Sequence, residues 1–283
     1  MGFESMRGKS ARFGVRTLLS VIALVPVLGR GADTDTSWLD IESRIQYGYY
    51  TEDPHTLRNL ADPLAANPAH DRLKSYYQGL LEYRLTLLWQ ANTDKAPGAA
   101  DASGGKPPVP ASRNDRTKNE PRQRVERCVA YLDQALEAQS NFADALALQS
   151  ACLRMLAELS TWRAPLATPK SVSDIHKALQ LAPKNPRVLL LDAIGDYEHS
   201  KTPDASAEHA CGKFKAATVM FEEERAAVDR VPGWGAAEAY TWLGRCYLDT
   251  GDAVKARDAL ERALLIAPEF AQARRLLAAI TSG

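Results

Sequence analysis

The clearest alternation of hydrophobic and polar positions lies close to the C-terminus. Tyr240, Leu243 and Tyr247 are spaced i, i+3 and i+7, so a helix over this segment carries all three on one face. Gly251 and Asp252 follow, and such a pair is typical of a turn because glycine tolerates the left-handed backbone at a helix end. The pattern predicts an amphipathic helix that ends in a tight turn.

A second helix is predicted directly after this turn. Ala256, Leu260 and Ala263 repeat at i, i+4 and i+7, and Pro268 stops the helix. Gly244 in the first helix and Ala256 in the second are small, which lets two antiparallel helices approach closely. The two segments are therefore expected to pack as a helix–turn–helix pair.

Together these positions resemble the tetratricopeptide repeat, a helix–turn–helix unit of about 34 residues. The first helix reads Tyr240-x-x-Leu243-Gly244-x-x-Tyr247. Tyr240 stands where the family usually has Trp, and Leu260 where it usually has Phe, so both sites keep a large apolar group. The resemblance implies a superhelix that binds protein or peptide segments on its concave face, which the first helices of the units line.

The end of the second helix recurs upstream, which indicates further units. Copies of residues 263–268 are found at 178–183, 63–68, 135–140 and 227–232. Five such ends imply five helical pairs, and a final helix near 270–280 would cover the last apolar face. We expect an all-α, right-handed α-solenoid of about five tetratricopeptide-like units with a C-terminal capping helix, over residues 33–283.

The intervals between these ends exceed one repeat, so segments are inserted between the two helices of a unit. The second unit carries an insertion over 92–121, the third is expected to break at Pro165 and Pro169, and the fourth at 201–204. Equivalent loops of a stacked solenoid emerge on one edge. Residues 92–121 contain almost no large apolar group, so we expect disorder there. This insertion is either a tolerated surface loop or a flexible arm that assists partner capture.

The N-terminus has the layout of a secretory signal peptide over residues 1–32. Basic residues precede a short apolar segment, 17–28, which is followed by the small residues Gly29, Gly31 and Ala32. The apolar segment is shorter than the roughly 20 residues that a membrane-spanning helix needs. A cleaved signal and a retained N-terminal anchor are both open. We expect a periplasmic or secreted protein with no stable membrane span after cleavage.

The charge balance and the motifs of the sequence reduce the number of function classes to consider. Lys and Arg number 35 and so do Asp and Glu, which leaves no basic surplus for a phosphate backbone, so a nucleic-acid partner is not expected. No nucleophile–base motif, zinc-ligand spacing or phosphate-binding glycine loop is present in the sequence. Asp196, His199 and His209 suggest a metal site only weakly. We expect no enzyme activity, no cofactor and no metal.

The four cysteines lack a C-x-x-C pair. Cys128 and Cys152 come level about the turn near residues 140–141, so a disulfide is one interpretation. Cys211 and Cys246 are less symmetric about their turn, and their pairing is less favoured. The alternative for all four is a small, unpaired residue buried between helices, which we favour.

Resemblance to the family places the partner-binding site in the concave groove. Eight positions on first helices are candidates for exposed groove residues: Arg187, Leu190, Ile194, Tyr197, Glu238, Thr241, Arg245 and Leu248. The favoured function is a non-catalytic adaptor or scaffold in the cell envelope that holds a partner segment in this groove. A carbohydrate-associated or structural accessory, with exposed aromatics on the concave face, is the alternative, and an enzyme with an unrecognised site comes third.

Overall fold

The computed structural model describes residues 1–2, 30–67, 72–94, 115–199, 207–225 and 231–281, with only the backbone of 30–37, 93–94 and 115–118. Every regular element in these ranges is a helix. In chain order the helices are α1 (Arg30–Tyr50), α2 (Pro54–Arg58), α3 (Ala61–Ala66), α4 (Arg72–Asp94), α5 (Asp115–Ala138), α6 (Ala143–Leu159), α7 (Ala164–Leu181), α8 (Pro186–His199), α9 (Ala207–Glu224), α10 (Ala236–Asp249), α11 (Ala253–Ile266) and α12 (Ala271–Thr281).

The helices form consecutive pairs. The first unit is α1 with α2 and α3, and the next four are α4–α5, α6–α7, α8–α9 and α10–α11. Helix α12 packs on α11 and closes the last unit. The predicted all-α solenoid of five pairs with a capping helix is confirmed.

One buried motif repeats along the second helices and explains the pairing. Each carries a small, a large and a small residue at i, i+4 and i+7: Cys128-Leu132-Ala135, Ser171-Ile175-Ala178, Ala210-Phe214-Ala217 and Ala256-Leu260-Ala263. All of these side chains are buried. A Cβ added to Gly244 would lie 2.7 Å from Cγ of Leu260, so only glycine lets α10 approach α11 this closely.

The predicted turn at Gly251 and Asp252 is present, and a similar tight turn precedes α2. Asp53 accepts hydrogen bonds from the backbone N–H groups of His55 and Thr56 at the start of α2. Asp252 accepts from the N–H of Lys255 at the start of α11, and the preceding Gly251 has a φ of +80°. Both aspartates satisfy N–H groups that a helix start leaves without partners.

Two of the expected interruptions are wrong. Helix α7 runs through Pro169, whose missing N–H removes one bond on an exposed face while Ala167, Ser171 and Asp174 stay packed on the other. The insertion expected over 92–121 is shorter at both ends, because 92–94 belong to α4 and 115–121 to α5. Its centre, 95–114, lies outside the described residues, as do 200–206 and residues 3–29 of the expected signal segment.

Two disulfides join neighbouring units. Cys128 of α5 is bonded to Cys152 of α6, and Cys211 of α9 to Cys246 of α10, with Cα separations of 6.4 and 5.6 Å. Each bridge thus links the second helix of one unit to the first helix of the next. The interpretation of four unpaired thiols is wrong in this structure, because neighbouring helices bring each pair of small residues level.

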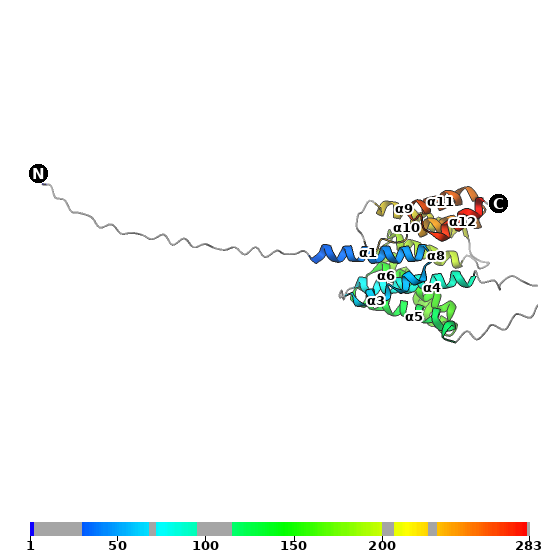
Figure 1. Ribbon diagram of the computed structural model, residues 1–283, viewed down its shortest axis with the longest axis horizontal. Helices are drawn as coiled ribbons and strands as arrows, with labels where there is room; N and C mark the ends of the chain where they lie inside the picture. The colour runs from blue at the N-terminus through cyan, green and yellow to red at the C-terminus, as the bar shows by residue number, and fades with distance from the viewer. Residues whose placement is uncertain (3–29, 68–71, 95–114, 200–206, 226–230, 282–283) are drawn as a thin grey trace, which may run out of the picture.

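The superhelix is wound so tightly that its first and last units touch. In Figure 1, α1 (blue) runs across the helical body near the C-terminal helices α10 to α12 (orange to red). Tyr50 at the end of α1 lies against Phe270 with ring centroids 4.4 Å apart, and its hydroxyl donates to Glu238 of α10. The concave side of the solenoid is therefore occupied by the chain's own N-terminal helix.

Candidate functional site

The structure places most of the predicted groove residues in the interior. Six of the eight are buried, and their exposure was predicted wrongly: Arg187, Leu190, Ile194, Tyr197, Glu238 and Thr241. Leu190 is fully inaccessible and Glu238 is 2% exposed. Arg245 and Leu248 are half-buried. Leu190 and Glu238 are buried by other parts of the chain: Leu190 lies beside Gly235, and Glu238 binds Tyr50 of α1, contacts that repeat periodicity does not reveal.

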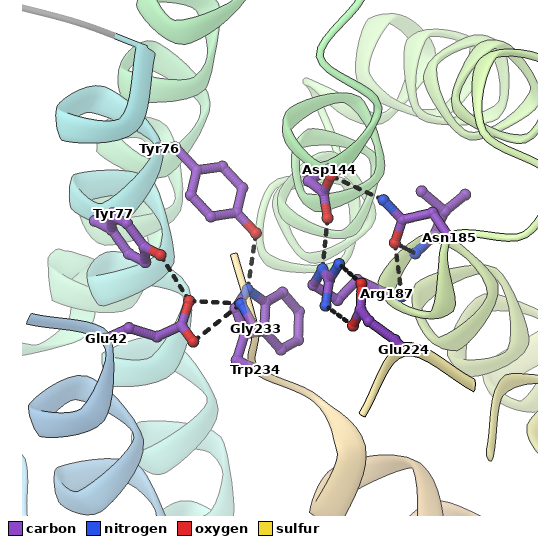
Figure 2. A network of polar contacts seen from close by, with 10 residues as sticks. Glu42, Tyr76, Tyr77, Asp144, Asn185, Arg187, Glu224, Gly233 and Trp234 are labelled. Atoms are coloured by element: carbon purple, nitrogen blue, oxygen red, sulfur yellow. Dashed lines mark hydrogen bonds and ion pairs between the residues drawn. The ribbon is translucent and has the colours of Figure 1, made fainter. Parts of the chain in front are cut away.

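Glu42 of α1 anchors this closure, as Figure 2 shows. Its carboxylate accepts hydrogen bonds from the Tyr77 hydroxyl, at 2.6 Å, and from the backbone N–H of Gly233, at 3.0 Å to each oxygen. The adjacent Trp234 is 2% exposed and donates from Nε1 to the Tyr76 hydroxyl at 2.8 Å. Burial raises the pKa of Glu42, while the bonds from Tyr77 and Gly233 oppose that rise.

A second buried cluster surrounds Arg187 at the start of α8. Its guanidinium donates to Asp144 at 2.6 Å and to both oxygens of Glu224 at 2.7 Å. Asn185 also donates to Asp144, so the third and fourth units meet in one polar network (Figure 2). Arg187 is buried and its three side-chain bonds go to carboxylates of neighbouring helices, so it acts as a structural residue here.

Arg84 forms the third cluster, on the inner face of α4. It is ion-paired with Glu238, and its guanidinium lies 4.1 Å from the ring centroid of Tyr49 and 4.7 Å from that of Trp234. Burial lowers the pKa of Arg84, but the charge of Glu238 and neighbouring tyrosines outweigh burial and raise the value overall. Aromatic rings thus replace water around a cation in the centre of the molecule.

One opening lies at the end where the first helices finish. It has a volume of about 340 Å³ and we call it the mouth pocket. Its lining comes from α1, α4, α8, α10 and α12: Tyr49, Glu52, Tyr83, Leu87, Leu88, Gln90, Ala91, Ile194, Glu198, Trp242, Arg245, Phe270, Gln272 and Arg275. Of the predicted groove residues, this pocket brings together Ile194 and Arg245.

The polar groups of the mouth pocket lie at its rim. Arg275 is ion-paired with Glu52, and this pair joins α12 to the turn between α1 and α2. Arg245 lies over the rings of Trp242 and Tyr197, 5.5 and 6.0 Å from their centroids. The half-buried indole of Trp242 also stacks on Phe214. The pocket can therefore hold an apolar side chain while its rim offers hydrogen-bond donors and carboxylates.

Sequence reasoning missed the residues that shape this pocket from the N-terminal side. Tyr49, Tyr83 and Leu87 lie on helices whose unit order gives no sign that they face α10. The available signal was Pro232-Gly-Trp-Gly235, in which a large apolar side chain sits inside a turn. A tryptophan in such a turn must be buried by a neighbour, and that neighbour is α4.

Neither a metal cluster nor a membrane span is found in the part of the chain that the structure describes. No group of three or more His, Cys, Asp or Glu side chains in these ranges is arranged to hold a metal ion. Asp196 and His209 approach to 3.4 Å, but Lys213 shares Asp196 with the imidazole. No described helix is long and apolar enough to cross a bilayer.

Comparison with solved structures gives only distant likenesses. The structure of MamA aligns with a TM-score of 0.37 and 15% identity, covering 61% of this chain and 86% of that one. The APC/C hetero-tetramer Cut9-Hcn1 gives 0.26 and 11% identity, covering 88% and 51%. A monomeric mutant of IFIT1 with Gppp-AAAA gives 0.25 and 14%, covering 74% and 55%. Against the last two, this chain spans about half of the other's length, and scores this low add nothing to the argument.

The sequence comparison is more specific. No curated protein matches the chain. The family model described as the tetratricopeptide repeat matches residues 209–280, which run from α9 to α12. This range contains the pattern from Tyr240 to Pro268 that suggested the same family. Residues 209–280 of this chain are therefore similar to the tetratricopeptide repeat, in keeping with the helical-repeat fold of the whole described structure.

Proposed function

We propose that this protein is an exported, non-catalytic scaffold that binds a partner protein through the mouth pocket. The carrying observation is that much of the inner face is covered by the chain itself, while the mouth pocket is an opening lined by five helices of four units. A partner segment is thus expected to insert one or two apolar side chains between Leu87 and Trp242, rather than to lie along the whole groove.

The rim of the pocket supports a protein ligand. Arg245 and Arg275 offer guanidinium donors and Glu198 a carboxylate around an apolar floor, and such a mixed lining suits a peptide with both side-chain types. The carbohydrate-associated alternative needs exposed aromatic rings on the concave side. Tyr76, Tyr77 and Trp234 are buried and Trp242 is half-buried, so the protein partner is the better proposal.

Export is part of the proposal and rests on the basic-then-apolar N-terminus together with the two disulfides. Disulfides persist mainly in oxidising compartments such as the periplasm or the secretory pathway. Fractionation of a bacterium that produces the full chain, or the chain lacking residues 1–29, tests it. We expect the full chain outside the cytoplasm with all four cysteines oxidised. Equal cytoplasmic retention of both forms would contradict export.

Binding at the mouth is tested by site-specific photo-cross-linking in the native host. A benzophenone amino acid replaces Gln90, at the mouth, or Val254, which is 73% exposed on α11. We expect one protein adduct from position 90 and none from 254, and Leu87→Asp should abolish it. Adducts of equal yield at both positions, or no adduct at 90, would refute the proposed site.

A further inference from the structure

The junction between the third and fourth units differs from its neighbours. Helix α5 packs closely on α6, and α9 on α10, and a disulfide joins each pair. Helix α7 packs far less against α8, and no disulfide joins these two helices. The third unit therefore meets the fourth mainly through α6 and α8, which leaves the space beside α7 open.

That space is a cavity of about 500 Å³, which we call the joint pocket. Its apolar floor is made by Ala157, Val172 and Ile175, together with the backbone of Gly195. Val172 is 48% exposed, so apolar surface of the pocket is in contact with solvent. A Cβ on Gly195 would lie 3.2 Å from Nη1 of Arg154, so the glycine leaves room for that side chain to cross the pocket.

The rim of the joint pocket carries an excess of negative charge. Four carboxylates line it, from Glu158, Asp192, Asp196 and Glu198. Arg154 contacts Glu198 at 3.4 Å. Lys213 reaches in from α9 to Asp192 and Asp196, at 2.7 and 2.6 Å. Asp192 and Asp196 thus share one lysine, with His209 3.4 Å from Asp196, and the electrostatic potential beside them favours an incoming cation.

We propose that the joint pocket is a second binding site, for a peptide segment that carries a large apolar side chain next to a lysine or arginine. The apolar side chain enters between Val172 and Ile175, and the basic group lies beside Asp196, which shares Lys213 with Asp192. The volume is within the range of pockets that hold small ligands or peptide side chains. The site is separate from the mouth pocket and stands even if the mouth binds nothing.

Selection from a phage library of random peptides, on the full oxidised chain, tests this inference. Enriched peptides should combine a large apolar residue with a neighbouring Lys or Arg. Calorimetry with the most enriched peptide then compares Val172→Phe, which fills the pocket, with Val219→Phe. Val219 is also 48% exposed but lies on α9 outside the pocket, so it is a matched control.

We expect Val172→Phe to weaken the dissociation constant about tenfold or more, and Val219→Phe to leave it within about twofold. Asp196→Asn should weaken binding of the basic peptide more than of the same peptide with alanine at the basic position. Failure to enrich any peptide, enrichment without basic residues, or equal effects of the two Val→Phe changes would overturn the inference. Peptides whose binding is lost with Leu87→Asp but kept with Val172→Phe would overturn this inference and would support binding at the mouth pocket.

Discussion

Arg84 and Glu238 are ion-paired in the centre of the molecule, although 154 positions separate them in the sequence. Both side chains are 3% exposed, and the Tyr50 hydroxyl donates to the same carboxylate at 2.6 Å. The pair therefore joins the second unit to the fifth across what would otherwise be an open groove. The pair and the Tyr50 bond therefore hold the superhelix closed.

Removing one member of this pair should be strongly destabilising. Glu238→Ala leaves the Arg84 charge buried without its carboxylate, and we expect a loss of about 3–5 kcal/mol in the free energy of unfolding. Denaturant unfolding followed by circular dichroism measures it. The control is Arg257→Ala, which breaks an exposed pair with Glu261 on α11 and should cost at most about 0.5 kcal/mol. Similar losses for both variants would contradict the central role of the pair.

The buried carboxyl of Glu42 should make stability depend on pH. Its pKa is raised in the folded state, so between its unfolded value of 4.5 and the folded value the native protein binds more protons than the unfolded chain. The free energy of unfolding therefore gains a contribution as pH falls through this window and loses it as pH rises.

Glu42→Gln should remove that contribution, because the amide does not titrate but can still accept the bond from Gly233. We expect the free energy of unfolding of the wild type to rise relative to that of the variant as pH falls toward 4.5. The measurement is the difference in unfolding free energy between the two proteins over this pH range. A difference that does not change with pH would show that Glu42 titrates normally.

Each of the two disulfides should stabilise the protein, and each can be removed without the other. Replacing Cys128 and Cys152, or Cys211 and Cys246, by alanine is expected to lower the free energy of unfolding by about 2–4 kcal/mol, because the unfolded chain loses a constraint. Peptide mapping without reductant should recover the same two linked pairs. Shuffled pairs, or free thiols in the exported protein, would contradict the structure.

Two helical glycines should respond in opposite directions to the same substitution. Gly244→Ala places a methyl group 2.7 Å from Cγ of buried Leu260 and should cost about 1–3 kcal/mol. Gly212→Ala in α9 meets nothing within 4 Å and should stabilise the protein by about 0.5–1 kcal/mol, through helix propensity. Thermal unfolding measures both. If Gly244→Ala leaves stability unchanged, then α10 and α11 can move apart without destabilising the protein.

The units could be predicted from sequence because their information is local. The spacing of Ala256, Leu260 and Ala263 fixes one helix face, and Gly251 fixes a turn, whatever the rest of the chain does. Pro169 misled because a proline signals a break only where packing does not hold the helix together, and α7 is held by its buried side.

The candidate site was less accessible to sequence reasoning. Whether Leu190 or Glu238 faces solvent depends on the curvature of the stack, which is set by small rotations between units rather than by any single motif. Glu42 and Gly233 are 191 positions apart, and no repeat pattern relates them. Large apolar residues on the inner face could mean a ligand groove or a closed core, and only the three-dimensional structure separates the two.

The closure between Glu42 and Gly233 also constrains the order of events during synthesis. A ribosome releases the N-terminal residues first, so α1 emerges long before the segment 231–235 that covers it. Until then Trp38 and Ile45, both buried in the finished protein, lack part of their surroundings. Arg84 likewise lacks the Glu238 carboxylate with which it pairs. The first helix to be made is thus among the last to reach its final environment, and the nascent chain depends on its last third to complete its first.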